Sequence, residues 1–404
     1  MPCLADILIL AKSGRALAQS ARRGGWRPWV IDAFGDADTR ACAAGVAKVA
    51  MEGDGLSEPD VSKALDRRVR QGSLGGGSLG GGARAGVIYG SGVEAMPALL
   101  DRLAGRFEII GNGADVVRTV KDPRAFFARL AAFGIAYPAT RFTAPDNERC
   151  DRPRGISGDD WPARDWLVKR ATGSGGEHVR RWNGESIDGP QHYFQRFVSG
   201  PAMSALFVAD GCRARIIGYN TQWGASRASA FGYGFIYGGA INRARLSPPQ
   251  RALVADHVSA LAEAFGLRGL NSLDFVLHRG QPRVLEINPR PGATCELYEP
   301  EAPDGMLALH VRACDGDLLG ERPMRARVHA HAIVYAQRRI RVPADMRWPR
   351  WCRDLPADGA AIPARAPVCS VVAEGDGMEP VRRLIEARCR AVWNALTPAS
   401  RRAA

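Results

Sequence analysis

The residues best suited to chemistry lie in the segment LNSLDFVLHRGQPRVLEINPRPG, residues 270–292. Apolar and polar side chains alternate on both sides of a turn at 279–282, which predicts two antiparallel strands. Glu286 and Asn288 are two residues apart and therefore share one face of the second strand. Asp274 joins that face if the hairpin loop has three or five residues, whereas a four-residue loop places it on the other face. We expect a loop of three or five residues.

Asp274, Glu286 and Asn288 would then offer three oxygen ligands from rigid strands, a set that suits a hard cation such as Mg²⁺. Arg290 follows at the same alternation, between two prolines that fix the direction of the chain. The alternative is a solvated sheet face that happens to be polar. Two carboxylates, an amide and an arginine on one short hairpin instead indicate a combined metal and anion site.

A second segment, LVKRATGSGGEHV at 167–179, predicts a phosphate contact. An apolar strand carrying Lys169 runs into a glycine-rich turn, where missing side chains let backbone N–H groups approach phosphate oxygens. The segment is neither a Walker A loop, which ends in GK[ST], nor a GxGxxG fingerprint, and an ordinary glycine-rich hairpin turn is the alternative. The predicted contact residues are Lys169, Thr172, Gly173, Ser174, Gly175 and Gly176.

The elements that position these segments begin with an α/β layer. The opening sequence predicts a buried strand, a tight turn at Ser13 and Gly14, and a helix over 15–23. WRPWVIDAFGD and GVIYG predict two further strands of this layer. Later, HAHAIVYAQRRIRVP predicts a strand or hairpin, and 378–396 an amphipathic helix.

A chain of 404 residues exceeds the size at which one hydrophobic core usually keeps growing, so we expect several subdomains. We place an α/β domain at 1–115, an α+β domain at 116–322, and a C-terminal lobe of strands and helix at 323–404. The glycine-rich stretch 72–84 is expected to be a flexible surface loop, because no strand leads into it and no Lys-Ser/Thr follows.

Composition narrows the functional classes. The net charge of +13 would permit nucleic-acid binding, but no run alternates Lys or Arg with aromatic residues, so a small polyanionic substrate explains the charge as well. No apolar run approaches the ~20 residues that a membrane helix needs. Nine scattered cysteines without a CxxC pair indicate reduced thiols. We therefore expect a cytoplasmic protein with neither a nucleic-acid nor a membrane partner.

Two further segments carry residue types that could bind a metal or a substrate. His329 and His331 are two apart on a predicted strand, but no third ligand lies nearby, so a structural role is favoured over metal binding. Residues 219–237 interleave aromatic side chains with Gly, Ser, Asn and Gln. This stretch is either a substrate loop or an ordinary glycine-rich loop.

In their order along the chain, Lys121, the Lys169 glycine turn, the segment YFQRFVSGPAMSALFVADG and the LDF…LEINPRP hairpin resemble the ATP-grasp superfamily over roughly residues 1–320. The resemblance implies an ATP-grasp fold of the α/β and α+β classes, with an N-terminal Rossmann-like pre-ATP-grasp domain and a small C-terminal lobe. Only five of the 55 Lys and Arg residues are lysine, and two of these five occupy the family's phosphate positions.

The resemblance also implies roles for single residues. Lys121 and Lys169 would hold the ATP phosphates, Arg290 would join Lys169 in steadying the developing negative charge, and Asp274, Glu286 and Asn288 would hold Mg²⁺, which Mn²⁺ could replace. Many relatives carry an acidic residue where this chain has Arg196, and glutamate is common at Asp274. The adenine would pack against the hinge through main-chain hydrogen bonds at Gln195, Arg196, Phe197 and Val198.

The implied activity is that of an ADP-forming ligase, which activates a carboxylate as an acyl phosphate and joins it to an amine. Both substrates would be small molecules, expected to be anionic, and the oligomeric state is open, with a homodimer among the options. A narrower resemblance, to ATP-grasp enzymes of tetrahydromethanopterin-linked one-carbon metabolism related to tyramine–glutamate ligase, rests on ILILAKSGRALAQSARRGGW and GYNTQWGA. The alternatives are an ATP-grasp carboxylase, a kinase-like enzyme and a non-catalytic nucleotide sensor.

Overall fold

The computed structural model describes residues 6–70, 86–145, 166–187, 189, 191–225, 234–318 and 327–397. The glycine-rich stretch 72–84 and the predicted boundary at 322 lie outside these ranges. The division into domains at 115 and 322 therefore stays a prediction. In the described part of the chain, no helix is both long enough and apolar enough to cross a membrane.

The N-terminal part forms a parallel five-stranded sheet in the order β3-β2-β1-β6-β7. Its strands are β1 (Asp6–Ala11), β2 (Arg27–Asp32), β3 (Gly45–Lys48), β6 (Gly86–Tyr89) and β7 (Glu108–Ile109). Around it lie α1 (Arg15–Arg23), α2 (Ala37–Cys42), α3 (Glu58–Arg70), α4 (Pro97–Ala104), α5 (Ala114–Lys121) and the small hairpin β4 (Met51–Glu52) and β5 (Gly55–Leu56). The predicted strand and helix at the start of the chain are confirmed.

Alternation along β1 explains why this sheet is covered on both faces. Ile7 and Ile9 pack toward α1, whereas Leu8 and Leu10 pack with residues of α3 and α4. Successive side chains of a strand point to opposite faces, so a continuous apolar strand needs a layer on each side. The strand order reverses between β1 and β6, and the loops at their carboxyl ends therefore lie at the position where open α/β sheets usually bind ligands.

A second, antiparallel sheet has the order β10-β9-β11-β8. It consists of β8 (Thr140–Arg141), β9 (Trp166–Arg170), β10 (Arg180–Arg181) and β11 (His192–Arg196), and α6 (Pro123–Ala132) precedes it in the chain. The predicted strand at DWLVKRA is β9, and it carries Lys169.

The largest sheet has eight antiparallel strands in the order β16-β15-β12-β13-β14-β17-β21-β19. Their bounds are β12 (Ala202–Asp210), β13 (Ala214–Gly224), β14 (Tyr237–Asn242), β15 (Arg268–His278), β16 (Gln281–Asn288), β17 (Val328–Tyr335), β19 (Cys352–Arg353) and β21 (Pro367–Gly375). The remaining elements are α7 (Pro248–Phe265), the 3-10 turns η1 (Ala293–Leu297) and η2 (Glu299–Glu301), α8 (Met306–Cys314), the pair β18 (Ile340–Arg341) and β20 (Ala361–Ile362), and α9 (Met378–Leu396). The C-terminal strands thus extend the same sheet.

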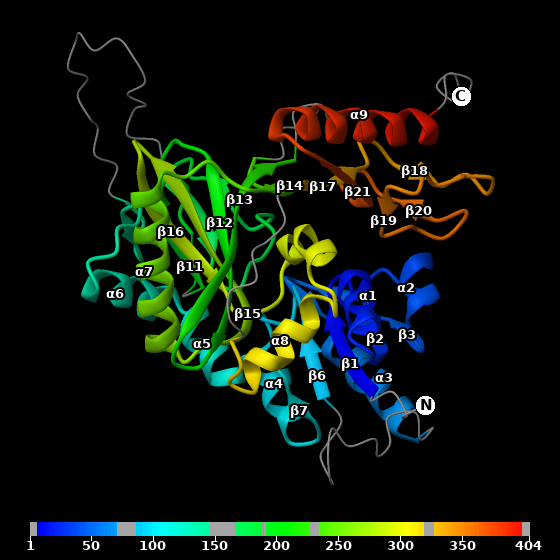
Figure 1. The fold of residues 1–404 in the computed structure, drawn as a ribbon, viewed down its shortest axis with the longest axis horizontal. Helices are drawn as coiled ribbons and strands as arrows, with labels where there is room; N and C mark the ends of the chain where they lie inside the picture. The colour runs from blue at the N-terminus through cyan, green and yellow to red at the C-terminus, as the bar shows by residue number, and fades with distance from the viewer. Residues whose placement is uncertain are drawn as a thin grey trace.

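One face of the large sheet carries two apolar cores. On β12 and β15, Met203, Phe207 and Phe275 share a core with α7, while Ala330 and Val371 of β17 and β21 share a core with α9. Figure 1 shows α7 and α9 at opposite ends of the sheet, with the N-terminal sheet beside it. The polar residues of these strands therefore face the other way.

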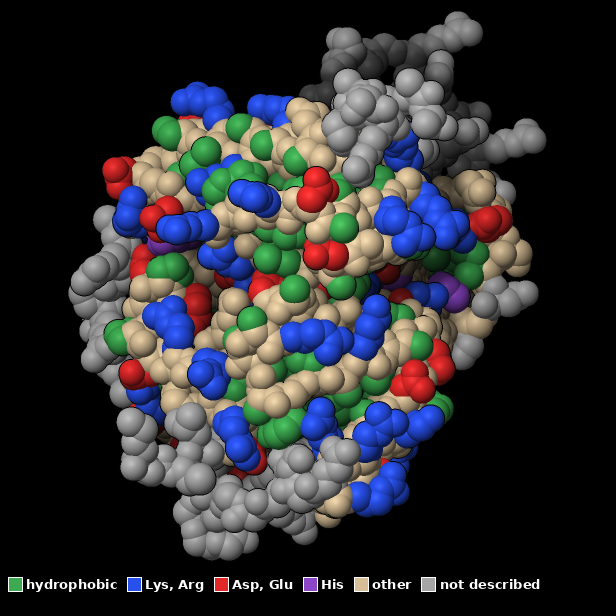
Figure 2. Space-filling view, turned by 90° about the vertical axis from the view of Figure 1, so that its right-hand side faces the viewer, with side chains coloured by type: hydrophobic (Ala, Val, Ile, Leu, Met, Phe, Trp, Pro, Cys, Tyr) green, Lys and Arg blue, Asp and Glu red, His purple; other side chains and the backbone are tan. Residues whose placement is uncertain are grey.

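The face of the molecule in Figure 2 carries Lys and Arg side chains scattered among polar and apolar ones. They do not gather into one continuous patch on this face. Its pattern is unlike the basic stripe typical of a nucleic-acid groove.

Candidate functional site

The hairpin β15–β16 is joined by a turn of two residues, Arg279 and Gly280, both at positive φ. The expected loop of three or five residues is therefore wrong. Regular pairing outward from a two-residue turn would place Asp274 opposite Leu285 and on the wrong face. The register instead shifts between Asp274 and Phe275, so that Asp274 pairs with Glu286. This bulge at Leu285 restores the shared face that the sequence predicted.

The three predicted metal ligands lie in contact on that face. Asn288 Nδ2 donates a hydrogen bond to Asp274 Oδ2 at 3.1 Å. Lys121, the last residue of α5, donates from Nζ to Glu286 Oε2 at 3.1 Å and to Asn288 Oδ1 at 3.3 Å. Lys121 is therefore brought to the hairpin although it lies 165 residues before Glu286.

The pKa values of the two carboxyl groups, Glu286 and Asp274, are shifted in opposite directions. Burial alone would raise the pKa of Glu286, but the positive charges of Lys121, His178 and Lys169 outweigh it and lower that pKa to about 2. Burial and the charge of Glu286 raise the pKa of Asp274 to about 7. Burial and the neighbouring carboxylate thus disfavour the charged form of Asp274, and the charges of Lys121 and Arg290 act against them.

The donor set fits a hard divalent cation. Mg²⁺ is usually bound through one or two carboxylates with substrate phosphates completing its shell, and Asp274, Glu286 and Asn288 offer two carboxylates and an amide. Among the described residues, no group of three His, Cys, Asp or Glu side chains is placed to form a metal site of the all-protein kind. The assignment of these three residues as ligands stays a prediction.

Lys169 is buried on β9 and donates from Nζ to Gln195 Oε1 at 2.7 Å. Burial lowers the pKa of Lys169, and the charge of Lys121 acts in the same direction, whereas Glu286 and Asp274 act against it. The two lysines and the two carboxylates therefore share one electrostatic environment. A mixture of cationic and acidic side chains of this kind suits a polyphosphate chelated to a cation.

The glycine turn after β9 is held from two sides. Thr172 Oγ1 donates to Asp54 Oδ2 at 3.2 Å, and Tyr237 N donates to Gly175 O at 2.9 Å. Gly176 has φ +80°, and a Cβ there would lie 1.9 Å from the carbonyl oxygen of Phe235. Only glycine fits at such a position. Ser174 is half-buried, so the turn combines a tightly packed backbone with a short polar side chain.

The four predicted hinge residues differ in how far they are exposed to solvent. Gln195 is buried and links Lys169 to Thr140 Oγ1, which accepts from Gln195 Nε2 at 3.1 Å. Phe197 lies 6.2 Å from the ring of Phe235. Arg196 is exposed, and Val198 is half-buried. An adenine role for these four residues stays a prediction.

Three residues of this region were not predicted from the sequence. Glu94 Oε1 accepts a hydrogen bond from Arg290 Nε at 2.8 Å, and both side chains are buried. His178 folds back against Gly173, where an added Cβ would lie 1.9 Å from its ring. Lys12 pairs with Glu177 at 3.4 Å. The spacing GEH after the glycine turn is a weak signal for His178, and no local pattern identifies Glu94.

Glu94 and Lys12 belong to the loops after β6 and β1, on either side of the position where the order of the N-terminal sheet reverses. Ligands of open α/β sheets bind outside the carboxyl ends of the strands at such a position. One loop reaches Arg290 and the other reaches the glycine turn. The two loops at this position therefore contact the hairpin and the glycine turn.

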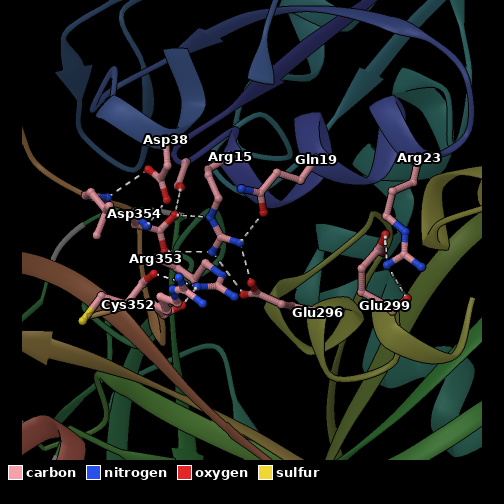
Figure 3. Close-up of polar contacts among 12 residues, drawn as sticks. Arg15, Gln19, Arg23, Asp38, Glu296, Glu299, Cys352, Arg353 and Asp354 are labelled. Atoms are coloured by element: carbon pink, nitrogen blue, oxygen red, sulfur yellow. Dashed lines mark hydrogen bonds and ion pairs between the residues drawn. The ribbon is translucent and has the colours of Figure 1, made fainter. Parts of the chain in front are cut away.

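A buried charge cluster joins three parts of the chain (Figure 3). Arg15 of α1 donates from Nε to Asp354 Oδ1 at 3.0 Å and from Nη2 to Glu296 Oε2 at 3.1 Å. Asp38 accepts from the backbone N–H groups of Asp354 and Leu355, both at 2.9 Å. These contacts hold the C-terminal strands and η1 against the N-terminal sheet.

The two histidines and the described ends of the stretch 219–237 lie on strands. Residues 219–224 belong to β13 and Tyr237 begins β14, so the described ends of the stretch predicted as a loop are sheet, and 226–233 lie outside the described ranges. His331 of β17 contacts Tyr237, and His329 lies near Glu374.

Comparison with known proteins places these observations in a family context. Residues 121–294 match the model of the ATP-grasp domain family. No curated protein sequence matches the chain.

Solved structures share the fold. Biotin carboxylase of Campylobacter jejuni, in an ATP complex, has 12% identity and a TM-score of 0.70, with 95% of this chain and 90% of that chain covered. L-amino acid ligase of Bacillus licheniformis has 14% identity and a TM-score of 0.63, with 96% and 97% covered. The chain also covers 36% of the length of Rhizobium etli pyruvate carboxylase, with 95% of its own length matched, 15% identity and a TM-score of 0.66. Identities this low show a common fold.

Proposed function

From the premise that this chain has the ATP-grasp fold and carries an ATP-grasp domain at residues 121–294, we propose that it is an ATP- and Mg²⁺-dependent ligase. It transfers the γ-phosphoryl group of ATP to a substrate carboxylate and condenses the acyl phosphate with an amine. The observation that carries the proposal is the convergence of Lys121 and Lys169 with the face formed by Asp274, Glu286 and Asn288.

In this proposal the side chains act by binding and charge. Lys121 and Lys169 hold phosphate oxygens, and the glycine turn closes over them with its backbone N–H groups. Mg²⁺, held by Asp274, Glu286 and Asn288, would neutralise charge on the transferred phosphoryl group. Arg290, oriented by Glu94, lies beside Asn288 at 3.4 Å and would steady the charge that develops on the acceptor. No protein nucleophile is required, because positioning and electrostatics supply the catalysis.

The direct test is Glu286→Gln. We expect ADP formation with Mg-ATP to fall at least about 10-fold, because loss of outer-shell partners of a metal alone costs roughly 10–100-fold. Glu263→Gln, an exposed site on α7, is the matched control and should leave turnover unchanged. Equal turnover in wild type and Glu286→Gln would refute the metal assignment.

The substrate pair is a finer proposal. The resemblance to enzymes related to tyramine–glutamate ligase makes L-glutamate and tyramine the first carboxylate and amine to supply, followed by the standard amino acids and other primary amines. Amide product detected by mass spectrometry, together with ADP, supports ligation. A role in one-carbon cofactor synthesis would be supported if pterin- or furan-type amines gave the highest turnover.

Carboxylation is the second candidate, since a biotin carboxylase and a pyruvate carboxylase share the fold. It predicts ADP formation that depends on bicarbonate and requires no amine. A kinase-like enzyme would instead release a stable phosphorylated substrate, and a nucleotide sensor would release no ADP with any substrate. The same product assay separates all four.

A further inference from the structure

The polar face of the large sheet continues from the hairpin into the C-terminal strands. Ser204 pairs with both Asp274 and Asn220, and residues that pair across neighbouring strands point to the same face. Further along, Gln222 pairs with Ala240, and Ala240 pairs with His331. Asp274 and His331 therefore lie on the same face although four strand boundaries separate them.

A second bulge brings Tyr237 onto this face. The register of β13 and β14 shifts between Trp223 and Gly224, so that Gly224 pairs with Tyr237. Because Gly224 shares the face of Gln222, the side chain of Tyr237 points the same way. Regular pairing would instead place Gly238 opposite Gly224, and Tyr237 would then share the face of Gly239 and point to the apolar side of the sheet.

Tyr237 and His331 are in direct contact. The distance from Tyr237 Oη to His331 Nε2 is 2.7 Å, and His331 is 3% exposed. The backbone of Tyr237 is held at both ends, since its N–H donates to Gly175 O at 2.9 Å and its carbonyl accepts from Tyr335 Oη at 2.8 Å. The residue that carries this phenol is therefore also hydrogen-bonded to the glycine turn through its backbone.

Charged groups from four elements surround the pair. Burial, followed by the charge of Asp274, raises the pKa of Tyr237, so the phenol keeps its proton unless a neighbour accepts it. Burial lowers the pKa of His331, which leaves the imidazole neutral and able to accept. Glu296 of η1 and Asp354 after β19 act against that lowering, and Arg15 of α1 acts with it.

We propose that Tyr237 and His331 remove a proton from the amine substrate of the ligase. Tyr237 is the catalytic residue that touches the amine, and His331 acts through it as the proton acceptor. The inference rests on the ligase activity proposed above. It is carried by the 2.7 Å contact on the polar face shared with Asp274 and by the packing of Tyr237 against the glycine turn.

The chemistry balances as follows. The amine binds as an ammonium, one N–H proton passes to Tyr237 Oη, and the phenolic proton passes to His331 Nε2. This step leaves a neutral amine, a neutral tyrosine and an imidazolium. The nitrogen lone pair then attacks the acyl carbon, the C–N bond forms, the bond from the acyl carbon to the phosphate oxygen breaks, and the second N–H proton leaves with the phosphate as hydrogen phosphate. The imidazolium returns its proton to solvent.

The surroundings of His331 suit both states. The acceptor role requires the tautomer with its proton on Nδ1, and within the described residues this buried nitrogen has no hydrogen-bond partner, so neither tautomer is fixed from that side. Glu296 and Asp354 stabilise the imidazolium once it forms. Both carboxylates also hold Arg15, so the network tolerates a second positive charge.

The test compares two nucleophiles in the full-length enzyme with L-glutamate and ATP. Tyramine is an ammonium at pH 7.5 and needs the base, whereas hydroxylamine is a neutral molecule at this pH and does not. In Tyr237→Phe and His331→Gln we expect the ratio of amide to hydroxamate to fall roughly 100-fold relative to wild type. Raising the pH to 9.5 should recover most of the amide in both variants, because free tyramine then becomes available.

Tyr219→Phe is the matched control, since it removes a phenol on the opposite face of the sheet that donates to Arg251 O at 3.0 Å, and its ratio should equal that of wild type. Equal loss of amide and hydroxamate in the Tyr237 and His331 variants would show a structural role and overturn the inference, as would an unchanged ratio. A wild-type enzyme that forms neither product from any carboxylate tried would instead refute the ligase function itself.

Discussion

The buried histidine His310 gives a prediction whose size follows from the effect of burial on its pKa. His310 of α8 is 1% exposed, accepts at Nδ1 from the N–H of Leu270 at 2.8 Å, and donates from Nε2 to Ile110 O at 2.9 Å. It thereby ties the end of the N-terminal sheet to β15, the strand that carries Asp274. Protonating Nδ1 would break the bond to Leu270 and bury a charge.

Burial lowers the pKa of His310 from 6.5 to about 4. The unfolded chain therefore binds a proton between these values that the folded protein does not, and stability falls as the pH decreases from 6.5 toward 4. At 1.36 kcal/mol for each pKa unit, the loss reaches about 3 kcal/mol below pH 4 and about 2 kcal/mol at pH 5. Above pH 6.5 the contribution is complete.

His310→Gln is the perturbation, because an amide can accept from Leu270 and donate to Ile110 without titrating. Chemical denaturation followed by tryptophan fluorescence at pH 7.5 and pH 5 gives the free energy of unfolding of both proteins. We expect the wild type to lose about 2 kcal/mol more than the variant between these pH values. Parallel losses would refute the reasoning, and so would an imidazole NMR titration of His310 with a midpoint near 6.5.

Two further perturbations test the site and the buried cluster. Lys169→Met should abolish the rise in melting temperature that Mg-ATP produces, because it removes the buried ammonium from the predicted phosphate contact. Lys63→Met, on the exposed side of α3, should retain this rise. A full rise in melting temperature in Lys169→Met would rule out the phosphate role. Arg15→Met should lower the free energy of unfolding in denaturant by about 3–5 kcal/mol, because Glu296 and Asp354 lose their cation. Arg27→Met, which breaks a half-exposed ion pair, should lower it by only about 0–1 kcal/mol. Similar losses in the two variants would contradict the buried role of Arg15.

The elements that could be predicted are those with local causes. The strand at β1, the helix α1 and the helix α9 lie where the sequence pattern placed them, because burial of one face imposes a period of two or of 3.6 on the side chains. The resemblance carried by Lys121, Lys169 and the hairpin likewise led to the ATP-grasp fold. Both the periodic pattern and the family motifs depend on residues that are close together in the sequence.

The hairpin shows how a local rule fails. The turn length alone would place Asp274 and Glu286 on opposite faces, and only the bulge at Leu285 aligns them. A bulge depends on how both strands pack against their neighbours in the sheet, so alternation within either strand does not reveal it.

By itself the sequence determined the elements with a clear period, such as β1, α1 and α9, and the ATP-grasp fold. Tertiary structure decided which distant residues meet: Glu94 reaches Arg290 across 196 residues of chain, and Tyr237 reaches His331 across 94. The physical reason is that period and propensity act over a few residues, whereas pairing between distant side chains is set by the register and packing of whole sheets.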